Sequence, residues 1–247
     1  MNTVLGREPR DWWNTVALGL SALIVFLMIW LNACSSAPTD AAKTNGATTP
    51  AASSAVPTKE SLPGSLSNAG EYGENIYDYA KAADWKNAVG KLTALRDAAK
   101  NVRAEVKNQS TAVDRLDTNV AALGRAVAVK DRQAAMREAN QVTLDVADMT
   151  AAYKLSVPVE VTKLDYYGRE LEVWAQAQDA NKLQATAREM RQTWDGLRPS
   201  IETRSATEAK KFDGLIVRVE SARTPAEYAR IATPVLDEVD NLEKLFQ

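Results

Sequence analysis

Residues 82–102 read AADWKNAVGKLTALRDAAKNV, and this stretch contains the unit from which the fold is built. Asp84 stands where a helix would begin, because its carboxylate can accept hydrogen bonds from the free N–H groups of a first helical turn. Apolar residues then recur at intervals of three and four, the spacing that places side chains on one face of an α-helix. The stretch predicts a helix whose buried face is formed by Ala88, Leu92, Leu95, Ala99 and Val102.

The same pattern occurs four times along the chain. The helix-start residues Asp84, Asp131, Asp179 and Thr224 follow one another at spacings of 47, 48 and 45 residues. When the four segments are aligned on these caps, seven positions are apolar in every copy, two before the cap and five after it. The position eleven residues after the cap holds Leu95, Val142, Met190 and Val235. Each repeat therefore predicts a helical hairpin in which both helices carry an apolar stripe.

Four hairpins give eight helices, so we expect an all-α fold. Pro158 and Pro199 mark breaks between hairpins, because proline loses a backbone hydrogen bond inside a helix. The expected helices cover residues 71–82, 85–107, 110–129, 132–154, 158–177, 180–198, 204–222 and 225–246. A helix with one apolar stripe is unstable alone, so the hairpins must pack together. We favour two four-helix bundles, at 71–155 and 156–247, over a continuous stack of hairpins.

Two other kinds of sequence precede the repeats. Residues 35–70 are rich in Ser, Thr, Ala and Pro and nearly lack large apolar side chains, so we expect a disordered linker there. Residues 15–31, TVALGLSALIVFLMIWL, carry no charge and have the length of a signal-peptide core or a short membrane span. Arg7 and Arg10 precede this run, which predicts a cytoplasmic N-terminus and an extracytoplasmic remainder.

The apolar run ends in Leu31-Asn32-Ala33-Cys34, which resembles the lipobox of bacterial lipoproteins. The resemblance implies cleavage before Cys34, a diacylglycerol on the Cys34 thiol and acylation of the new amino terminus. Residues 1–34 would then be the signal peptide and its lipidated cysteine. The alternative is an uncleaved single-pass anchor in which Cys34 is incidental or palmitoylated. Either way we expect the folded part to be tethered to the cell membrane or the outer membrane on its extracytoplasmic side.

The first half of the helical region also resembles small, uncharacterised helical domains of membrane-anchored Gram-positive proteins. The shared feature is a turn of the form DW-x-x-A that opens a long helix, here at residues 84–88. The resemblance implies a helical-bundle ectodomain and carries no known chemistry.

Composition excludes several classes of function. The chain has no histidine, which rules out His-dependent catalysis and His-containing metal sites. It has a single cysteine, so the exported part holds no disulfide, and its net charge of −2 indicates no nucleic-acid partner. Acidic residues such as Asp145 and Asp148 are interpreted as solvated helix faces rather than metal ligands. We therefore expect no enzymatic activity, no cofactor and no metal, and we identify no catalytic residue.

Three aromatic residues are candidates for contact with a partner. Trp85 follows a cap and lies off the apolar stripe, so it either packs over the turn or forms an exposed anchor. Tyr166 and Tyr167 are adjacent and point about 100° apart on a helix, so we expect one in the core and one on the surface. They belong to the stretch DYYGRELE at residues 165–172, where Gly168 allows close approach of a neighbouring helix.

These observations favour a membrane-tethered helical scaffold or adaptor that binds another envelope component, such as a protein or a wall polymer. The alternative is an ectodomain that binds a small molecule or an ion between its helices. The discriminating feature is the surface of the folded part, because a polar cavity favours ligand binding and an apolar patch favours an adaptor.

Overall fold

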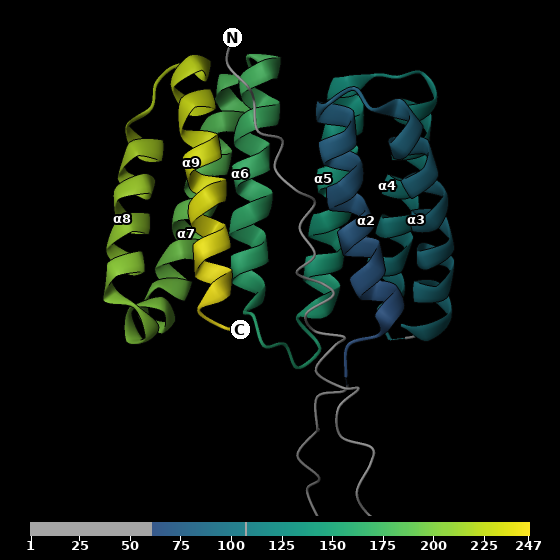
Figure 1. Cartoon of the computed structure of the whole chain (residues 1–247), viewed down its shortest axis with the longest axis horizontal. Coiled ribbons are helices and arrows are strands. Elements are labelled where there is room, and N and C mark those ends of the chain that lie inside the picture. Colours follow the sequence, from purple (N-terminus) through teal and green to yellow (C-terminus); the bar gives the residue numbers. More distant parts are fainter. Residues whose placement is uncertain (1–60, 107) are drawn as a thin grey trace, which may run out of the picture.

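The computed structural model describes residues 61–106 and 108–247, and in this part of the chain every regular element is an α-helix (Figure 1). The all-α prediction is confirmed for these residues. The helices are α2 (Gly64–Lys81), α3 (Trp85–Glu105), α4 (Ser110–Ala128), α5 (Arg132–Thr150), α6 (Val159–Ala177), α7 (Ala180–Arg204), α8 (Ala206–Ser221) and α9 (Pro225–Lys244).

The four predicted caps begin four of these helices. Asp84, Asp131 and Asp179 accept hydrogen bonds from backbone N–H groups three residues later, at 3.2, 3.0 and 3.0 Å. Thr224 does the same at 3.3 Å and completes a capping box with Glu227, whose carboxylate accepts the Thr224 N–H. The caps thus satisfy donors that a helix N-terminus would otherwise leave unpaired.

The turn before each aspartate cap has left-handed backbone. Ala83, Lys130 and Gln178 have φ angles of 57°, 57° and 58°, respectively. In each of these turns the cap N–H donates to the carbonyl five residues earlier, as from Asp84 to Tyr79 at 2.8 Å. This is the Schellman arrangement, which ends one helix and starts the next within a few residues.

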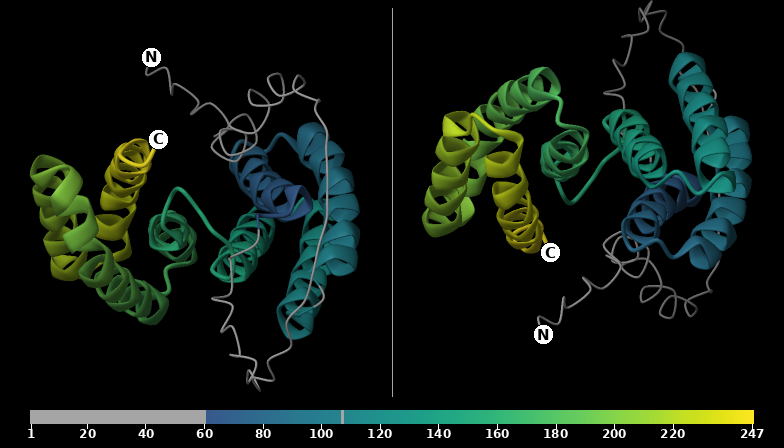
Figure 2. Two further views of the ribbon diagram at one scale, coloured as in Figure 1. Left: turned by 90° about the horizontal axis from the view of Figure 1, so that it is seen from below. Right: turned by 90° about the horizontal axis from the view of Figure 1, so that it is seen from above.

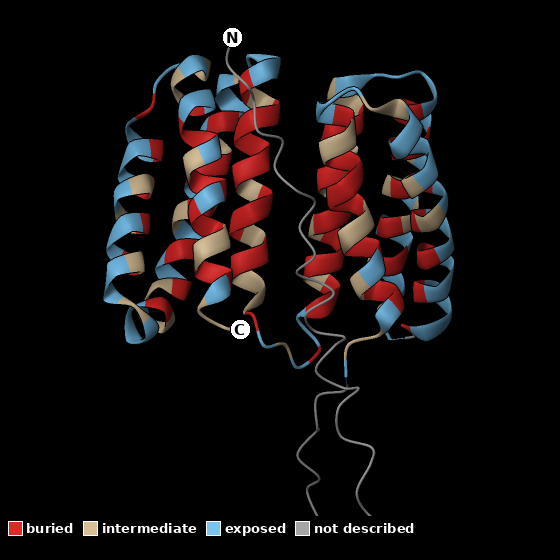
Figure 3. Cartoon of the chain, viewed as in Figure 1, coloured by how far each residue is buried: buried red, intermediate tan, exposed pale blue. Residues whose placement is uncertain are grey.

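The helices pack as two four-helix bundles, shown from two further sides in Figure 2. In the first bundle α2 packs on α3 and α5, and α4 packs on the same two helices. In the second bundle α6 and α8 pack in the same way on α7 and α9. The repeated apolar positions are buried in both cores except for Tyr79 and Trp174, which are half-buried. In Figure 3 the buried parts of the helices lie mainly toward neighbouring helices, and the exposed parts lie mainly on the outer sides of the bundles.

Helix α2 begins earlier than the sequence indicated. The expected linker ended at residue 70, whereas α2 starts at Gly64 and places Leu66 and Ala69 in the first core, both fully buried. The hydroxyl of Ser65 donates to Glu105 of α3 at 2.6 Å. The linker prediction is therefore wrong for residues 64–70, because two isolated apolar side chains are enough to add helical turns when a core already exists beside them.

The predicted break at Pro199 is also wrong, because α7 continues through this proline to Arg204. The proline removes one backbone hydrogen bond from the helix. Leu197 and Ile201 lie on either side of it with exposed fractions of 3 and 0%, so the apolar face continues across the proline. Burial of this face offsets the lost bond, and the helix ends only at Ser205, which caps α8.

The predicted anchor lies outside the described residues, as do Cys34 and the linker up to residue 60. Within residues 61–106 and 108–247, no helix combines the length and the apolar character needed to cross a bilayer.

Candidate functional site

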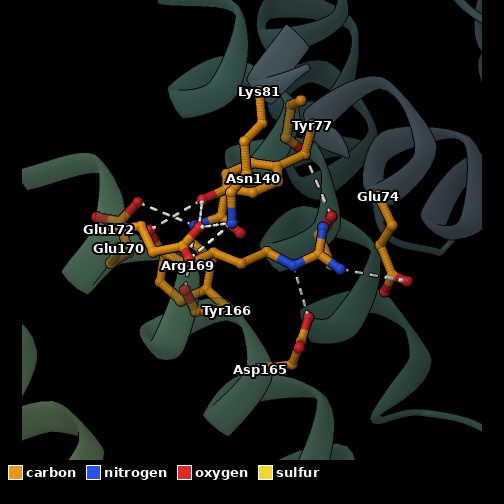
Figure 4. A network of polar contacts seen from close by, with 11 residues as sticks. Glu74, Tyr77, Lys81, Asn140, Asp165, Tyr166, Arg169, Glu170 and Glu172 are labelled. Atoms are coloured by element: carbon orange, nitrogen blue, oxygen red, sulfur yellow. Dashed lines mark hydrogen bonds and ion pairs between the residues drawn. The ribbon is translucent and has the colours of Figure 1, made fainter. Parts of the chain in front are cut away.

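A buried polar seam joins the two bundles where α6 lies against α5 and α2 (Figure 4). Residues 165–172, the stretch that contains both candidate tyrosines, supply the α6 side of this seam. The seam consists of Glu74, Tyr77 and Lys81 from α2, Asn140 from α5, and Asp165, Arg169, Glu170 and Glu172 from α6.

Arg169 is the central cation of the seam and is only 4% exposed. Its Nε lies 2.9 Å from Oδ2 of Asp165 on the same helix, and its Nη2 lies 3.6 Å from Oε2 of Glu74 on α2. Its guanidinium also stands over the ring of Tyr77, 4.9 Å from the ring centroid. Burial opposes the charged form, but Asp165 and Glu74 outweigh it and raise the pKa of Arg169, which therefore remains a cation.

Glu172 forms the second link between α6 and α2. Its carboxylate accepts a hydrogen bond from the Tyr77 hydroxyl at 2.8 Å and two from the Lys81 ammonium, both at 2.7 Å. Burial, and then the charge of Glu172, raise the pKa of Tyr77 well above its ordinary value. The Tyr77 hydroxyl consequently keeps its proton and donates a hydrogen bond to the Glu172 carboxylate.

The third link joins α5 to α6. The Asn140 amide donates to the carbonyl of Tyr166 at 3.1 Å and to Oε1 of Glu170 at 3.0 Å. The other oxygen of Glu170 accepts a short hydrogen bond from the indole of Trp174. Burial raises the pKa of Glu170, and the bonds from Asn140 and Trp174 oppose that rise. Each donor thus helps to hold a carboxylate that the fold has removed from water.

The links between α2 and α6 join equivalent positions of the repeat. Glu74 and Arg169 both stand ten residues before their caps, and Tyr77 and Glu172 both stand seven before. The position ten residues before the cap is therefore acidic in α2, where it holds Glu74, and basic in α6, where it holds Arg169. Charge complementarity between two copies of one scaffold fixes which faces meet, because a mismatched charge would remain buried and unpaired.

In chemical terms, the seam is a set of buried ion pairs and hydrogen bonds that connects the two bundles. Removing one member of a buried ion pair typically costs about 3–5 kcal/mol, whereas the intact pair contributes more to geometry than to net stability. The seam groups bind one another across the contact between α2, α5 and α6. This arrangement holds the two bundles in one relative position.

The predicted contact residues lie in two separate places. Tyr166 is 9% exposed beside the seam, where burial and then Glu170 raise the pKa of its hydroxyl. Tyr167 is half-buried, meets the Tyr166 ring edge-on at a centroid distance of 5.2 Å, and packs against the second core. Trp85 is half-buried against the first core at the start of α3, a helix that packs on α2 and α4 rather than on α6.

The seam residues on α2 and α5 were not identified from the sequence. One signal was present, because Tyr72-Gly73 in α2 and Tyr167-Gly168 in α6 occupy equivalent positions before their caps. Gly168 permits the close approach that was expected of it, since an added Cβ there would lie 2.6 Å from Cδ2 of Leu236 on α9. The shared Tyr-Gly pair identifies α2 and α6 as equivalent helices. The residue directly after this pair is Glu74 in α2 and Arg169 in α6, the two residues that pair across the seam.

The chain matches no known protein family, and neither a curated protein nor a solved structure shows significant similarity to it.

Proposed function

We propose that this protein is a membrane-tethered, extracytoplasmic helical scaffold that acts as an adaptor for another component of the cell envelope and catalyses no reaction. The observation that carries the proposal is the seam around Arg169. Two bundles with separate roles would need no specific contacts with each other. In this chain, paired charges and hydrogen bonds join the two bundles. A fixed pair of bundles presents surfaces of both at a constant spacing, as an adaptor requires.

The membrane tether in the proposal rests on the N-terminal sequence. The uncharged run at residues 15–31 follows Arg7 and Arg10 and ends in the lipobox-like Leu31-Asn32-Ala33-Cys34. A lipid on Cys34, or an uncleaved anchor, would keep the bundles on the outer side of the cell membrane or, in a cell with two membranes, of the outer membrane. The partner would then be an envelope protein or a wall polymer.

The tether is tested by exchanging Cys34 for Ser in the full chain. We expect the wild type to be found in the membrane fraction, to take up a fatty-acid analogue and to be digested when intact cells, or cells stripped of their outer layers, are treated with protease. Cys34→Ser should lose the label and keep the larger precursor size. A wild-type protein in the cytoplasmic fraction would contradict the proposal.

The adaptor role is tested by photo-crosslinking in living cells. A benzophenone amino acid in place of Trp85 or Tyr167 should give one discrete adduct, because these half-buried rings can contribute both to the core and to a contact. The same probe in place of Val217, which is 55% exposed on α8, serves as the control and should give no such adduct. Identical diffuse patterns from all three positions would contradict a specific partner at Trp85 and Tyr167.

A further inference from the structure

The second bundle contains a cleft that the seam does not involve. It lies between α7, α8 and the start of α9 and has a volume of about 480 Å³. This volume falls within the usual range of small-molecule sites, about 300–1,000 Å³. Its walls carry three arginines, Arg188, Arg191 and Arg223, and one carboxylate, Glu220.

The single carboxylate of the cleft is already paired. Arg191 donates from Nε to Oε1 of Glu220 at 3.0 Å and from Nη2 to Oε2 at 2.7 Å, and its Nη1 reaches Asp195 at 3.2 Å. The hydrogen bonds from Arg191 lower the pKa of Glu220, so the carboxylate is ionised and compensated by its arginine. Glu220 is therefore not available to neutralise the other two arginines.

Arg188 and Arg223 have no carboxylate within ion-pair distance among residues 61–106 and 108–247. Both are exposed, and one nitrogen of Arg223, Nη1, donates to the carbonyls of Glu220 and Ala222 at 2.8 and 3.0 Å. Those two bonds fix the direction of the Arg223 side chain and leave its other guanidinium N–H groups without a partner in the described part of the chain. The cleft thus holds two uncompensated positive charges.

Tyr228 lines the same cleft as these two arginines and is 3% exposed. Burial raises the pKa of its hydroxyl, and the nearby Arg223 and Arg188 oppose that rise. Both arginine side chains therefore line the same cleft as Tyr228 and favour a negative charge at its hydroxyl. Gln184 and Gln192, one turn before and one turn after Arg188 on α7, add neutral amide groups to the same cleft.

The equivalent region of the first bundle lacks this set. Thr93 stands where the second bundle has Arg188, Val127 where it has Glu220, and Ala135 where it has Tyr228. Val127 and Ala135 are buried at 2 and 0% exposed, so the first bundle forms its second hairpin with small apolar side chains at these two positions. The charged cleft is consequently not required by the architecture that the two bundles share.

We propose that the cleft between α7, α8 and α9 binds a small soluble anion through a carboxylate or phosphate group held by Arg188 and Arg223. Guanidinium groups bind these oxyanions with paired, charge-assisted hydrogen bonds. The remainder of the solute lies against Tyr228, and its hydroxyl or carbonyl groups meet Gln184 and Gln192. The site does not depend on the tether or on the adaptor function proposed above.

The test is calorimetric titration of the full chain in neutral detergent at low ionic strength. The probes are inorganic phosphate, citrate and glucose 6-phosphate, and glucose is the uncharged control. We expect saturable binding of one molecule per chain for at least one anion, none for glucose, and weaker binding as salt is added. Absence of saturable binding for all three anions would overturn the proposal, whatever the fate of the tether experiments.

Two single variants, their combination and one control variant test whether the anion binds in the cleft. Arg188→Gln and Arg223→Gln should each weaken the affinity about 10- to 100-fold, because each removes a hydrogen-bonded contact between charged groups. Lys130→Gln alters the equivalent turn position of the first bundle and should leave the affinity unchanged. Thermal unfolding of each variant shows that it is folded, as expected for exposed side chains. Undiminished binding by the folded double variant Arg188→Gln/Arg223→Gln would overturn the assignment.

Discussion

The two bundles have the same frame and different surfaces. In each, the apolar positions four, eight, eleven, fifteen and eighteen residues after a cap are buried in a core. In each, one helix of the first hairpin also approaches the second hairpin over a glycine, Gly73 or Gly168. The two bundles differ at the polar positions that lie between the shared apolar positions. One face of α6 carries the charges that bind the first bundle, and the second bundle contains the arginine cleft. Apolar repeat positions therefore specify the fold, and the polar positions between them distinguish one copy from the other.

One pair of equivalent arginines illustrates the difference. Arg96 and Arg191 both stand twelve residues after a cap. In the first bundle Arg96 lies over Gly124, so closely that a side chain there would collide with its guanidinium. In the second bundle Val217 replaces that glycine, and Arg191 turns instead to Glu220. A change from glycine to valine on α8 thus accompanies the opening of a cleft on this side of the bundle.

The largest effect should come from truncating the shared core position eleven residues after the cap. Leu95 and Met190 are both fully buried there, one in each bundle. Leu95→Ala and Met190→Ala should each lower the free energy of unfolding by about 2–5 kcal/mol, because a cavity replaces packed atoms. Denaturant titration measures this cost, with Lys130→Ala in an exposed turn as the control. Equal, small costs for all three variants would show that the two bundles do not share this core position.

A smaller effect should distinguish the two glycine contacts. An added Cβ at Gly168 would lie 2.6 Å from Cδ2 and 3.0 Å from Cγ of Leu236, whereas at Gly73 the nearest atom, Cγ1 of Val142, is 3.1 Å away. Gly168→Ala should therefore cost about 1–2 kcal/mol, since overpacking exceeds the gain in helix propensity. Gly73→Ala should be close to neutral. A more costly Gly73→Ala would reverse our assignment of the tighter helix contact to the second bundle.

The smallest predicted effect is a gain in stability at the turns. Ala83 has the left-handed φ of 57°, which is unfavourable for a residue with a Cβ. Ala83→Gly should therefore raise the free energy of unfolding by about 1 kcal/mol. Arg223 occupies the equivalent place in the fourth hairpin and is not left-handed, so Arg223→Gly should bring no gain. Thermal unfolding measures both effects. Equal stabilisation of Ala83→Gly and Arg223→Gly would contradict the assignment of the gain to the left-handed φ of Ala83.

The sequence was sufficient for the helical frame because its signals are local. A cap such as Asp131 and the apolar spacing after it act within a few turns, and the structure places helix starts and core residues accordingly. Prediction failed where packing overrides local preference. Leu66 is buried although its neighbours are small and polar, and α7 passes through Pro199 because Ile201 beyond it reaches the core.

The seam could not be derived in the same way. Whether Arg169 meets solvent or Glu74 depends on which faces of two separately formed bundles come together, and no local spacing encodes that choice. The cleft was likewise hidden, because Arg188 and Tyr228 are 40 residues apart in the sequence. Aligning the two halves and asking where a position changes in charge or polarity would have drawn attention to Arg169, which is equivalent to Glu74, and to Glu220, which is equivalent to Val127.

The claim that the seam fixes the two bundles is tested most directly by a distance measurement between them. Spin labels at Lys100→Cys on α3 and Lys210→Cys on α8, in the Cys34→Ser background, report one distance per molecule by pulsed electron resonance. We predict a single narrow distribution for the parent protein and a broad one after Arg169→Ala, which leaves Glu74 and Asp165 without their cation. A broad distribution in the parent, or one that Arg169→Ala leaves unchanged, would contradict the account.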